Sequence, residues 1–236
     1  MKNNSGAIIL TQLAQVTAER AERAADSGLA QRVLATKRYQ QRRFEVMYAD
    51  MLKHPRYAGA ARYFLDDLYG PTDFTLRDAQ FARTVPGLVR LFPAEVVATV
   101  EALTALHALS ERFDTAMARQ IDTEAVDACT YVQAWQRCDH AEDRERQIVL
   151  MLRVGDALDA FTRSPLLRHS LRTMRMPARA AGMAALQSFL ETGFETFRAM
   201  GGAAEFLALI GKRERQLARD LFSIDPAQAA RLGQLP

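Results

Sequence analysis

Apolar residues recur every three or four positions along most of this chain, which is the spacing of a single buried helix face. Ile9, Leu13 and Val16, for example, share one face of a helix predicted over residues 5–26. No stretch alternates apolar and polar residues for long enough to indicate a strand. The pattern therefore predicts an all-α protein.

Proline and glycine mark where the predicted helices begin and end. Gly70-Pro71 ends one helix, because glycine permits a left-handed cap and proline cannot continue the turn. Pro93 suits the first position of a helix that reaches about Arg119, and Pro177 opens another that reaches Met200. The other predicted helices cover residues 29–53, 57–69, 73–92 with an interruption or kink at Pro86, 123–139, 141–163, 165–173 and 203–222. Ser27-Gly28 breaks or kinks the chain between the first two of these segments, and with such kinked segments counted as one the pattern predicts about eight or nine helices.

These helices are expected to form one compact bundle over residues 1–236, because their connections are short. Residues 5–53 could instead form a separate arm, and the tail over residues 224–236 is expected to fray. Hydrophobic residues make up 49% of the 236 positions and charged residues 25%, which is enough to bury a sizeable core. Several apolar helix faces also predict a homodimer, which would bury one of them.

The net charge, the apolar stretches and the cysteine count indicate which partners and which cellular compartment to expect. A net charge of +3 is mild, and no helix-turn-helix or zinc-finger pattern accompanies it, which argues against a nucleic-acid binder. No apolar stretch approaches the roughly 20 residues that a membrane helix needs, and residues 7–10 are too short for a signal peptide. Two cysteines in so long a chain fit a reducing compartment. A soluble cytoplasmic protein with no membrane partner is expected.

A dense aromatic block stands near the middle of the first half of the chain. It reads Tyr63-Phe64-Leu65-Asp66-Asp67-Leu68-Tyr69-Gly70-Pro71. Its aromatic and leucine side chains form an apolar surface at helical spacing, and its two aspartates lie on the border of that surface. We therefore expect Phe64, Leu65 and Leu68 to belong to the core.

This block resembles the motif of a family of bacterial proteins named after the letters FFLEELY. The first Phe of that motif is Tyr63 here, and both Glu positions are aspartates. The likeness continues through Thr72-Asp73-Phe74, and it returns at Met174-Arg175-Met176-Pro177-Ala178 and at residues 189–194. The resemblance implies no activity and supplies no catalytic residue.

A run of uncompensated arginines is the sharpest charge feature. No Asp or Glu lies between Ala160 and Leu190, whereas the same window holds Arg163, Arg168, Arg172, Arg175 and Arg179. The spacing from Arg168 to Arg175 would place these arginines on one helix face. One interpretation is that Arg168, Arg172, Arg175 and Arg179 bind the phosphate or carboxylate of a small ligand. The alternative is that they pair with acids elsewhere in the fold, the candidates being Asp66, Asp67 and Glu191.

Residues 27–56 are also basic. Lys37, Arg38, Arg42 and Arg43, with Tyr39, could contact a nucleic-acid phosphate backbone. The sequence favours a solvated helix face or pairing with the acidic stretch over residues 121–147 instead.

Candidate catalytic and metal-binding residues are sparse. His107 lies in a strongly apolar helix with Glu111 one turn later, so the pair could act as a carboxylate-oriented base. The alternative is a core histidine that a neighbour satisfies. Cys129, Cys138 and His140 lack the spacing of a metal site, so no metal and no cofactor are expected. The sequence favours a non-enzymatic helical binding or regulatory protein, with the anion site on residues 168–179 and the His107 enzyme as alternatives.

Overall fold

The computed structural model describes residues 2–68, 71 and 74–236, without the side chains of residues 2, 3, 67 and 68. Over these residues the protein is all-α: twelve α-helices, one π-helical turn and one 3-10 turn, with no strand. The predicted fold class is confirmed, whereas the predicted number of eight or nine helices is wrong. No helix in the described part of the chain combines the length and the apolar composition that crossing a bilayer requires.

The helices are α1 (Lys2–Ala25), α2 (Ser27–Met47), α3 (Ala49–Lys53), α4 (Ala58–Tyr63), α5 (Thr75–Leu91), α6 (Ala94–Arg119), α7 (Ala128–Cys138), α8 (Ala141–Thr162), α9 (Pro165–Thr173), α10 (Arg175–Ala180), α11 (Ala184–Met200) and α12 (Ala204–Ser223). The π-helical turn covers Phe64–Leu68, directly after α4, and the 3-10 turn covers Pro226–Arg231.

Two of the additional helices arise where a predicted helix divides. The predicted helix over residues 29–53 ends at Tyr48, whose backbone leaves the helical region, and α3 begins after it. The predicted helix over residues 177–200 divides at Gly182, where φ is +69°. Glycine adopts this left-handed conformation without the steric cost that a Cβ would add. Pro177 lies in the first turn of α10, where its missing N–H leaves no helical hydrogen bond unmade.

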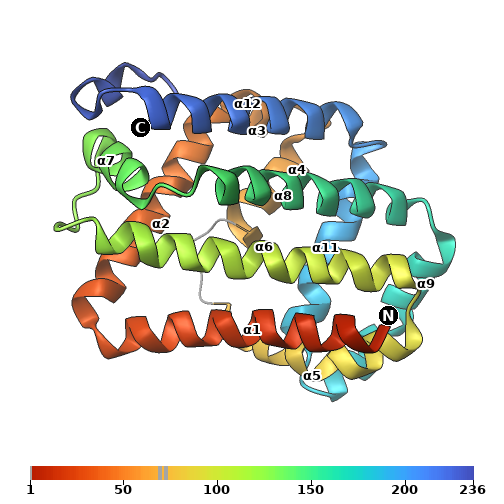
Figure 1. The fold of residues 1–236 in the computed structure, drawn as a ribbon. Coiled ribbons are helices and arrows are strands. Elements are labelled where there is room, and N and C mark those ends of the chain that lie inside the picture. The colour runs from red at the N-terminus through yellow and green to blue at the C-terminus, as the bar shows by residue number, and fades with distance from the viewer. Residues whose placement is uncertain (1, 69–70, 72–73) are drawn as a thin grey trace.

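Four long helices form the front of the molecule. Figure 1 shows α12, α8, α6 and α1 side by side, while α2 and α11 cross behind them. Helices α6 and α8 run in opposite directions, so the start of α8 lies beside the end of α6. Helix α7 closes that end of the pair, and α5, α9 and α10 gather at the opposite end.

The aromatic block lies in the largest core cluster. Tyr63, Phe64 and Leu65 are buried, as their spacing predicts, and the Phe64 ring lies 5.9 Å from that of Phe206. Asp66 is exposed. Tyr69 and Gly70, together with the side chains of Asp67 and Leu68, lie outside the described residues.

A second, smaller core cluster joins α1, α5 and α6. It contains Ile9, Leu13, Val85, Val89 and Val97. This cluster fixes α5 against α1 and so positions one wall of the cavity described below.

Candidate ligand-binding cavity

An elongated cavity of about 610 Å³ is lined by α6 and α8 and by the helices packed behind them. Its wall on α6 runs from Val96 to Asp114, and its wall on α8 runs from Arg144 to Phe161. With a rise of 1.5 Å per residue, each stretch is about 26 Å long. The cavity is therefore long relative to its volume, and the antiparallel helices α6 and α8 both line it along this length.

One half of the cavity is lined mainly by apolar side chains, although Arg77 and Arg83 of α5 and Gln187 of α11 also line the cavity. This half is built from the first half of α6, the second half of α8, and the faces of α5, α9 and α11 that point inward. Its wall includes Val100, Leu103, Val154, Leu158, Phe161, Phe81, Leu88, Leu167, Leu171, Phe189 and Phe194. Such a wall can bind the hydrocarbon part of a ligand through the hydrophobic effect.

The other half carries charged and polar groups. Because α6 and α8 are antiparallel, the polar residues late in α6 face those early in α8. This half is lined by His107, Glu111 and Asp114 of α6, Arg144 and Gln147 of α8, Lys37 and Arg43 of α2, and Glu214 of α12. Tyr131 and Trp135 of α7 close the end.

Arg144 is the most unusual of these groups. Its residue is only 5% exposed, and its guanidinium lies between two aromatic rings, 3.6 Å from the centroid of Phe113 and 3.8 Å from that of Trp135. Nη1 donates to Oε1 of Gln147 at 3.4 Å, whereas Nε and Nη2 have no hydrogen-bond partner among the described residues. Burial lowers the pKa of Arg144 to about 10, so the group still carries its charge at neutral pH.

Other cations around this half of the cavity are paired with acids. Nζ of Lys37 lies 2.9 Å from Glu111 and 3.2 Å from Asp114, and Arg43 lies 3.5 Å from Glu214. Within the described part of the chain, no carboxylate lies at ion-pairing distance from Arg144. A buried cation without a counter-ion is costly, which makes this position favourable for an anion.

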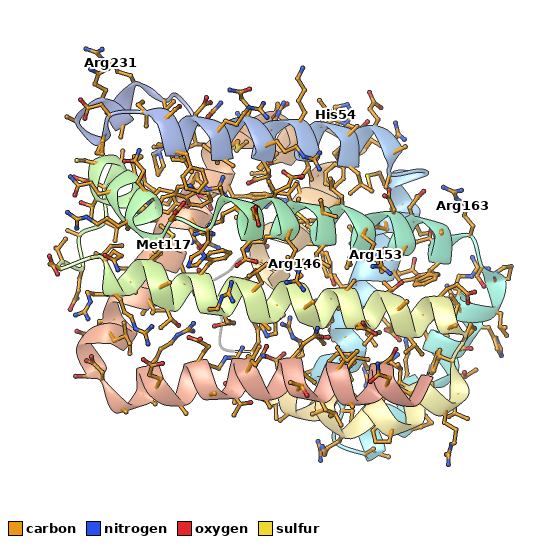
Figure 2. The ribbon with its side chains drawn as sticks, viewed as in Figure 1. His54, Met117, Arg146, Arg153, Arg163 and Arg231 are labelled. Carbon is orange, nitrogen blue, oxygen red and sulfur yellow. The ribbon has the colours of Figure 1, made fainter. Side chains whose placement is uncertain are left out.

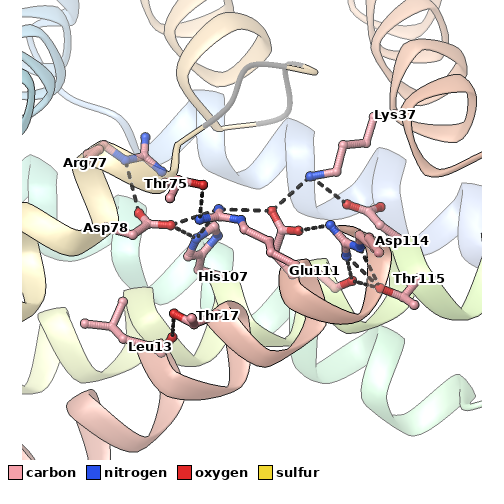
Figure 3. A network of polar contacts seen from close by, with 12 residues as sticks. Leu13, Thr17, Lys37, Thr75, Arg77, Asp78, His107, Glu111, Asp114 and Thr115 are labelled. Atoms are coloured by element: carbon pink, nitrogen blue, oxygen red, sulfur yellow. Dashed lines mark hydrogen bonds and ion pairs between the residues drawn. The ribbon is translucent and has the colours of Figure 1, made fainter. Parts of the chain in front are cut away.

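A network of ion pairs runs along the side of the cavity (Figure 3). Asp78 of α5 accepts from Arg20 of α1 at 2.9 Å and contacts Nε2 of His107 at 2.7 Å. Glu111 then joins Lys37 to Arg23, whose Nη1 lies 2.5 Å from its carboxylate. The network therefore connects α1, α2, α5 and α6.

The charges in the network reinforce one another. Burial alone would raise the pKa of Glu111, but Lys37 and Arg23 overcome that effect and lower it to about 2. Burial alone would likewise lower the pKa of Lys37, and the carboxylates of Asp114 and Glu111 raise it instead. These groups stay charged at neutral pH and hold the polar half in one geometry.

The proposed pairing of His107 with Glu111 is not what the structure contains. His107 contacts Asp78, and Glu111 bonds Arg23 and Lys37. Asp78 lies 29 residues before His107 and reaches it because α5 is fixed against α1 and α6. Similarly, Lys37 and Arg43 pair with acids of α6 and α12 rather than with residues 121–147.

The predicted arginine site divides between two helices. Arg168 and Arg172 lie on α9, and Arg175 and Arg179 lie on α10, with a break at Met174. All except the half-buried Arg168 are exposed. None of these four arginines lines the cavity. The side chains of this segment that do line it include the apolar Leu167, Leu171 and Met174.

One of the expected acidic partners, Glu191, does pair with an arginine of this segment, whereas Glu195 was not among the expected acids. Nε of Arg175 lies 2.6 Å from Glu191, one of the three acids considered, and Arg172 lies 3.9 Å from Glu195. The exposed Asp66 has no ion pair among the described residues. Arg172 and Arg175 pair with these glutamates because α9 and α10 pack against α11, the helix that carries Glu191 and Glu195.

Cys129 and Cys138 are free thiols. Across the described residues, no group of three or more His, Cys, Asp and Glu side chains is arranged to hold a metal ion.

Residues 19–228 match the model of a family described as "Domain of unknown function (DUF8198)". The chain belongs to this family. No match was found among curated proteins or among solved structures. The description of the family assigns no activity, so the function has to be argued from the cavity.

Proposed function

We propose that this protein is a non-enzymatic binder of elongated apolar molecules that end in a carboxylate, the chemical class of long-chain fatty acids. The observation that carries this proposal is Arg144, a buried guanidinium without an ion pair at the polar end of a long apolar cavity.

The shape of the cavity supports a ligand of this class. A volume of about 610 Å³ is within the usual range for small-molecule sites. Its length of about 26 Å accommodates an extended acyl chain. Each buried methylene contributes about 0.8 kcal/mol, so a long chain in the apolar half would supply most of the affinity.

The geometry of Arg144 supports a carboxylate in particular. Nε and Nη2, the two nitrogens without hydrogen-bond partners among the described residues, stand on one edge of the guanidinium plane. Two parallel N–H groups on that edge match the two oxygens of a carboxylate. Phe113 and Trp135 hold the plane on both sides, so the edge is oriented before a ligand arrives.

The test is a binding titration with a fluorescent polyene fatty acid and with the corresponding alcohol. Arg144→Gln should weaken binding of the acid about 10- to 100-fold, because it removes a charged hydrogen bond worth about 1.5–3 kcal/mol. It should leave the affinity for the alcohol nearly unchanged.

Arg146→Gln is the matched control, since Arg146 is exposed on the same helix and is labelled in Figure 2. This variant should bind the acid like the wild type. Equal affinity of Arg144→Gln and wild type for the acid, with both proteins folded by circular dichroism, would refute the proposal.

A further inference from the structure

We propose that the outer face of α9 and α10 docks onto the surface of an anionic lipid bilayer. This inference goes beyond the proposed function, because it concerns an outer surface and a second kind of partner. We define the docking face as the exposed residues Leu166, Arg172, Met176 and Arg179 together with the half-buried Arg168.

Two large apolar side chains stand out from this face. Leu166 of α9 is 71% exposed and Met176 of α10 is 72% exposed, whereas Leu167 and Leu171 of α9 are half-buried and Ala178 of α10 is buried. Within α9, Leu167 and Leu171 turn toward the cavity, whereas Leu166 faces outward. An apolar side chain that the fold leaves this exposed on an amphipathic helix is typical of a segment that inserts into the headgroup region of a bilayer.

The charge around these side chains is positive. The chain has no acid between Ala160 and Leu190. Arg168 and Arg179 form no ion pair with any described residue, and the exposed Arg172 lies 3.9 Å from its nearest acid, Glu195. Anionic headgroups attract such a cluster electrostatically, and the long arginine side chains can reach them while Leu166 and Met176 enter the apolar layer.

A bilayer fits this face better than an acidic protein or a second copy of the chain does. Two isolated apolar side chains, separated by arginines, do not form the contiguous buried centre that protein interfaces have. A second copy would bring the same arginines against one another.

The docking face also lies directly outside the apolar end of the cavity. Leu167, Leu171 and Met174 form the cavity wall from the same two-helix segment. A protein docked through this face would hold the apolar end of its cavity next to the bilayer.

The experiment is vesicle co-sedimentation of the full chain without added ligand. Vesicles of phosphatidylcholine alone are compared with vesicles of phosphatidylcholine and phosphatidylglycerol in equal parts. We expect binding to the mixed vesicles at least tenfold tighter than to the neutral ones, and a further loss when salt is raised to about 0.5 M, where the screening length is only a few ångströms.

Two variants test the face itself. Arg168→Gln/Arg172→Gln/Arg179→Gln should lower binding to mixed vesicles at least tenfold, and so should Leu166→Ser/Met176→Ser. The control Arg146→Gln/Arg153→Gln/Arg219→Gln removes the same charge from exposed positions on α8 and α12 and should bind like the wild type.

Binding that does not depend on phosphatidylglycerol, or equal losses in the control and the docking-face variants, would overturn the proposal. Absence of vesicle binding, together with arginine-dependent binding to polyglutamate, would assign the face to an acidic protein and would also overturn it. The fatty-acid titration contains no vesicles, so its failure and the failure of docking are distinguishable.

Discussion

The guanidinium of Arg144 stacks on the indole of Trp135, with Cζ 3.8 Å from the ring centroid. Trp135 is the only tryptophan in the chain. The Phe113 ring also lies over this guanidinium, 3.6 Å from Cζ to the ring centroid, so aromatic surface covers the charge, and Nε and Nη2 have no hydrogen-bond partner among the described residues. Such cation–π contacts contribute about 2 kcal/mol when they are desolvated, and they partly offset the cost of burying the charge.

This stacking makes the intrinsic fluorescence of the protein a reporter of the polar end of the cavity. A fatty-acid carboxylate at Arg144 changes the electrostatic field next to the indole. We therefore expect the emission maximum or the intensity of Trp135 to change when a non-fluorescent saturated fatty acid is titrated. Arg144→Gln should abolish the change at the same concentrations, and Arg146→Gln should retain it. A full response in Arg144→Gln would place the ligand away from this residue.

Arg144 and Glu111 are expected to respond to substitution in opposite ways when no ligand is present. Arg144→Met replaces a buried, unpaired charge with an apolar side chain of similar length, a change that is often neutral or stabilising by about 1–4 kcal/mol. Loss of the cation–π contacts opposes this gain, so a free energy of unfolding within about 1 kcal/mol of wild type is expected.

Glu111→Gln keeps the shape of the side chain but removes the shared partner of Arg23 and Lys37. It should cost about 3–5 kcal/mol, because the buried Arg23 loses its counter-charge and Lys37 keeps only Asp114 as a partner. Urea melts of both variants at pH 7 measure the difference. A larger loss for Arg144→Met than for Glu111→Gln would show that Arg144 is a structural group rather than a ligand-binding one.

The fold could be predicted from the sequence to the extent that it depends on local periodicity. The spacing in the aromatic block placed Phe64 and Leu65 in the core, where both are buried. The sequence pattern does not indicate the break at Gly182, because Pro177 predicts the start of a helix that Gly182 in fact interrupts. Whether a glycine stays helical or turns left-handed depends on where the next helix packs, and a local pattern does not contain that information.

The candidate site was harder to predict, because its key contacts join distant segments. His107 and Asp78 meet only when α5 lies against α6. Arg144 did carry a usable signal: it lies four residues before Ile148 and seven before Met151, on the buried strip of α8. A charged residue on an apolar helical strip indicates a buried charge, but its lack of an ion pair is visible only in the structure.

The pH dependence of stability is expected to depend strongly on Glu111. Its pKa falls from 4.5 to about 2 in the folded protein, because Lys37 and Arg23 overcome the opposing effect of burial. A depressed folded pKa stabilises the fold fully above the unfolded value, and this stabilisation is lost as the pH falls. The difference in unfolding free energy between wild type and Glu111→Gln should therefore be constant near neutral pH. It should shrink between about pH 4.5 and pH 2. Urea melts at pH 7, 4 and 3 test this, and a difference that grows toward low pH would contradict it.

Gly193 and Tyr63 provide a test of packing at the cavity wall. A Cβ added to Gly193 would lie 2.7 Å from Oη and 2.9 Å from Cζ of Tyr63, both closer than side chains tolerate. Gly193→Ala should therefore destabilise the protein by about 1–3 kcal/mol through overpacking, despite the better helix propensity of alanine. Gly87→Ala is the control, because Gly87 also lies inside a helix and a Cβ there meets no atom within 4 Å. It should leave stability unchanged or raise it by about 0.5–1 kcal/mol. Thermal melts of the two variants decide the point: if both shift the melting temperature in the same direction, the close approach of Tyr63 does not constrain this helix.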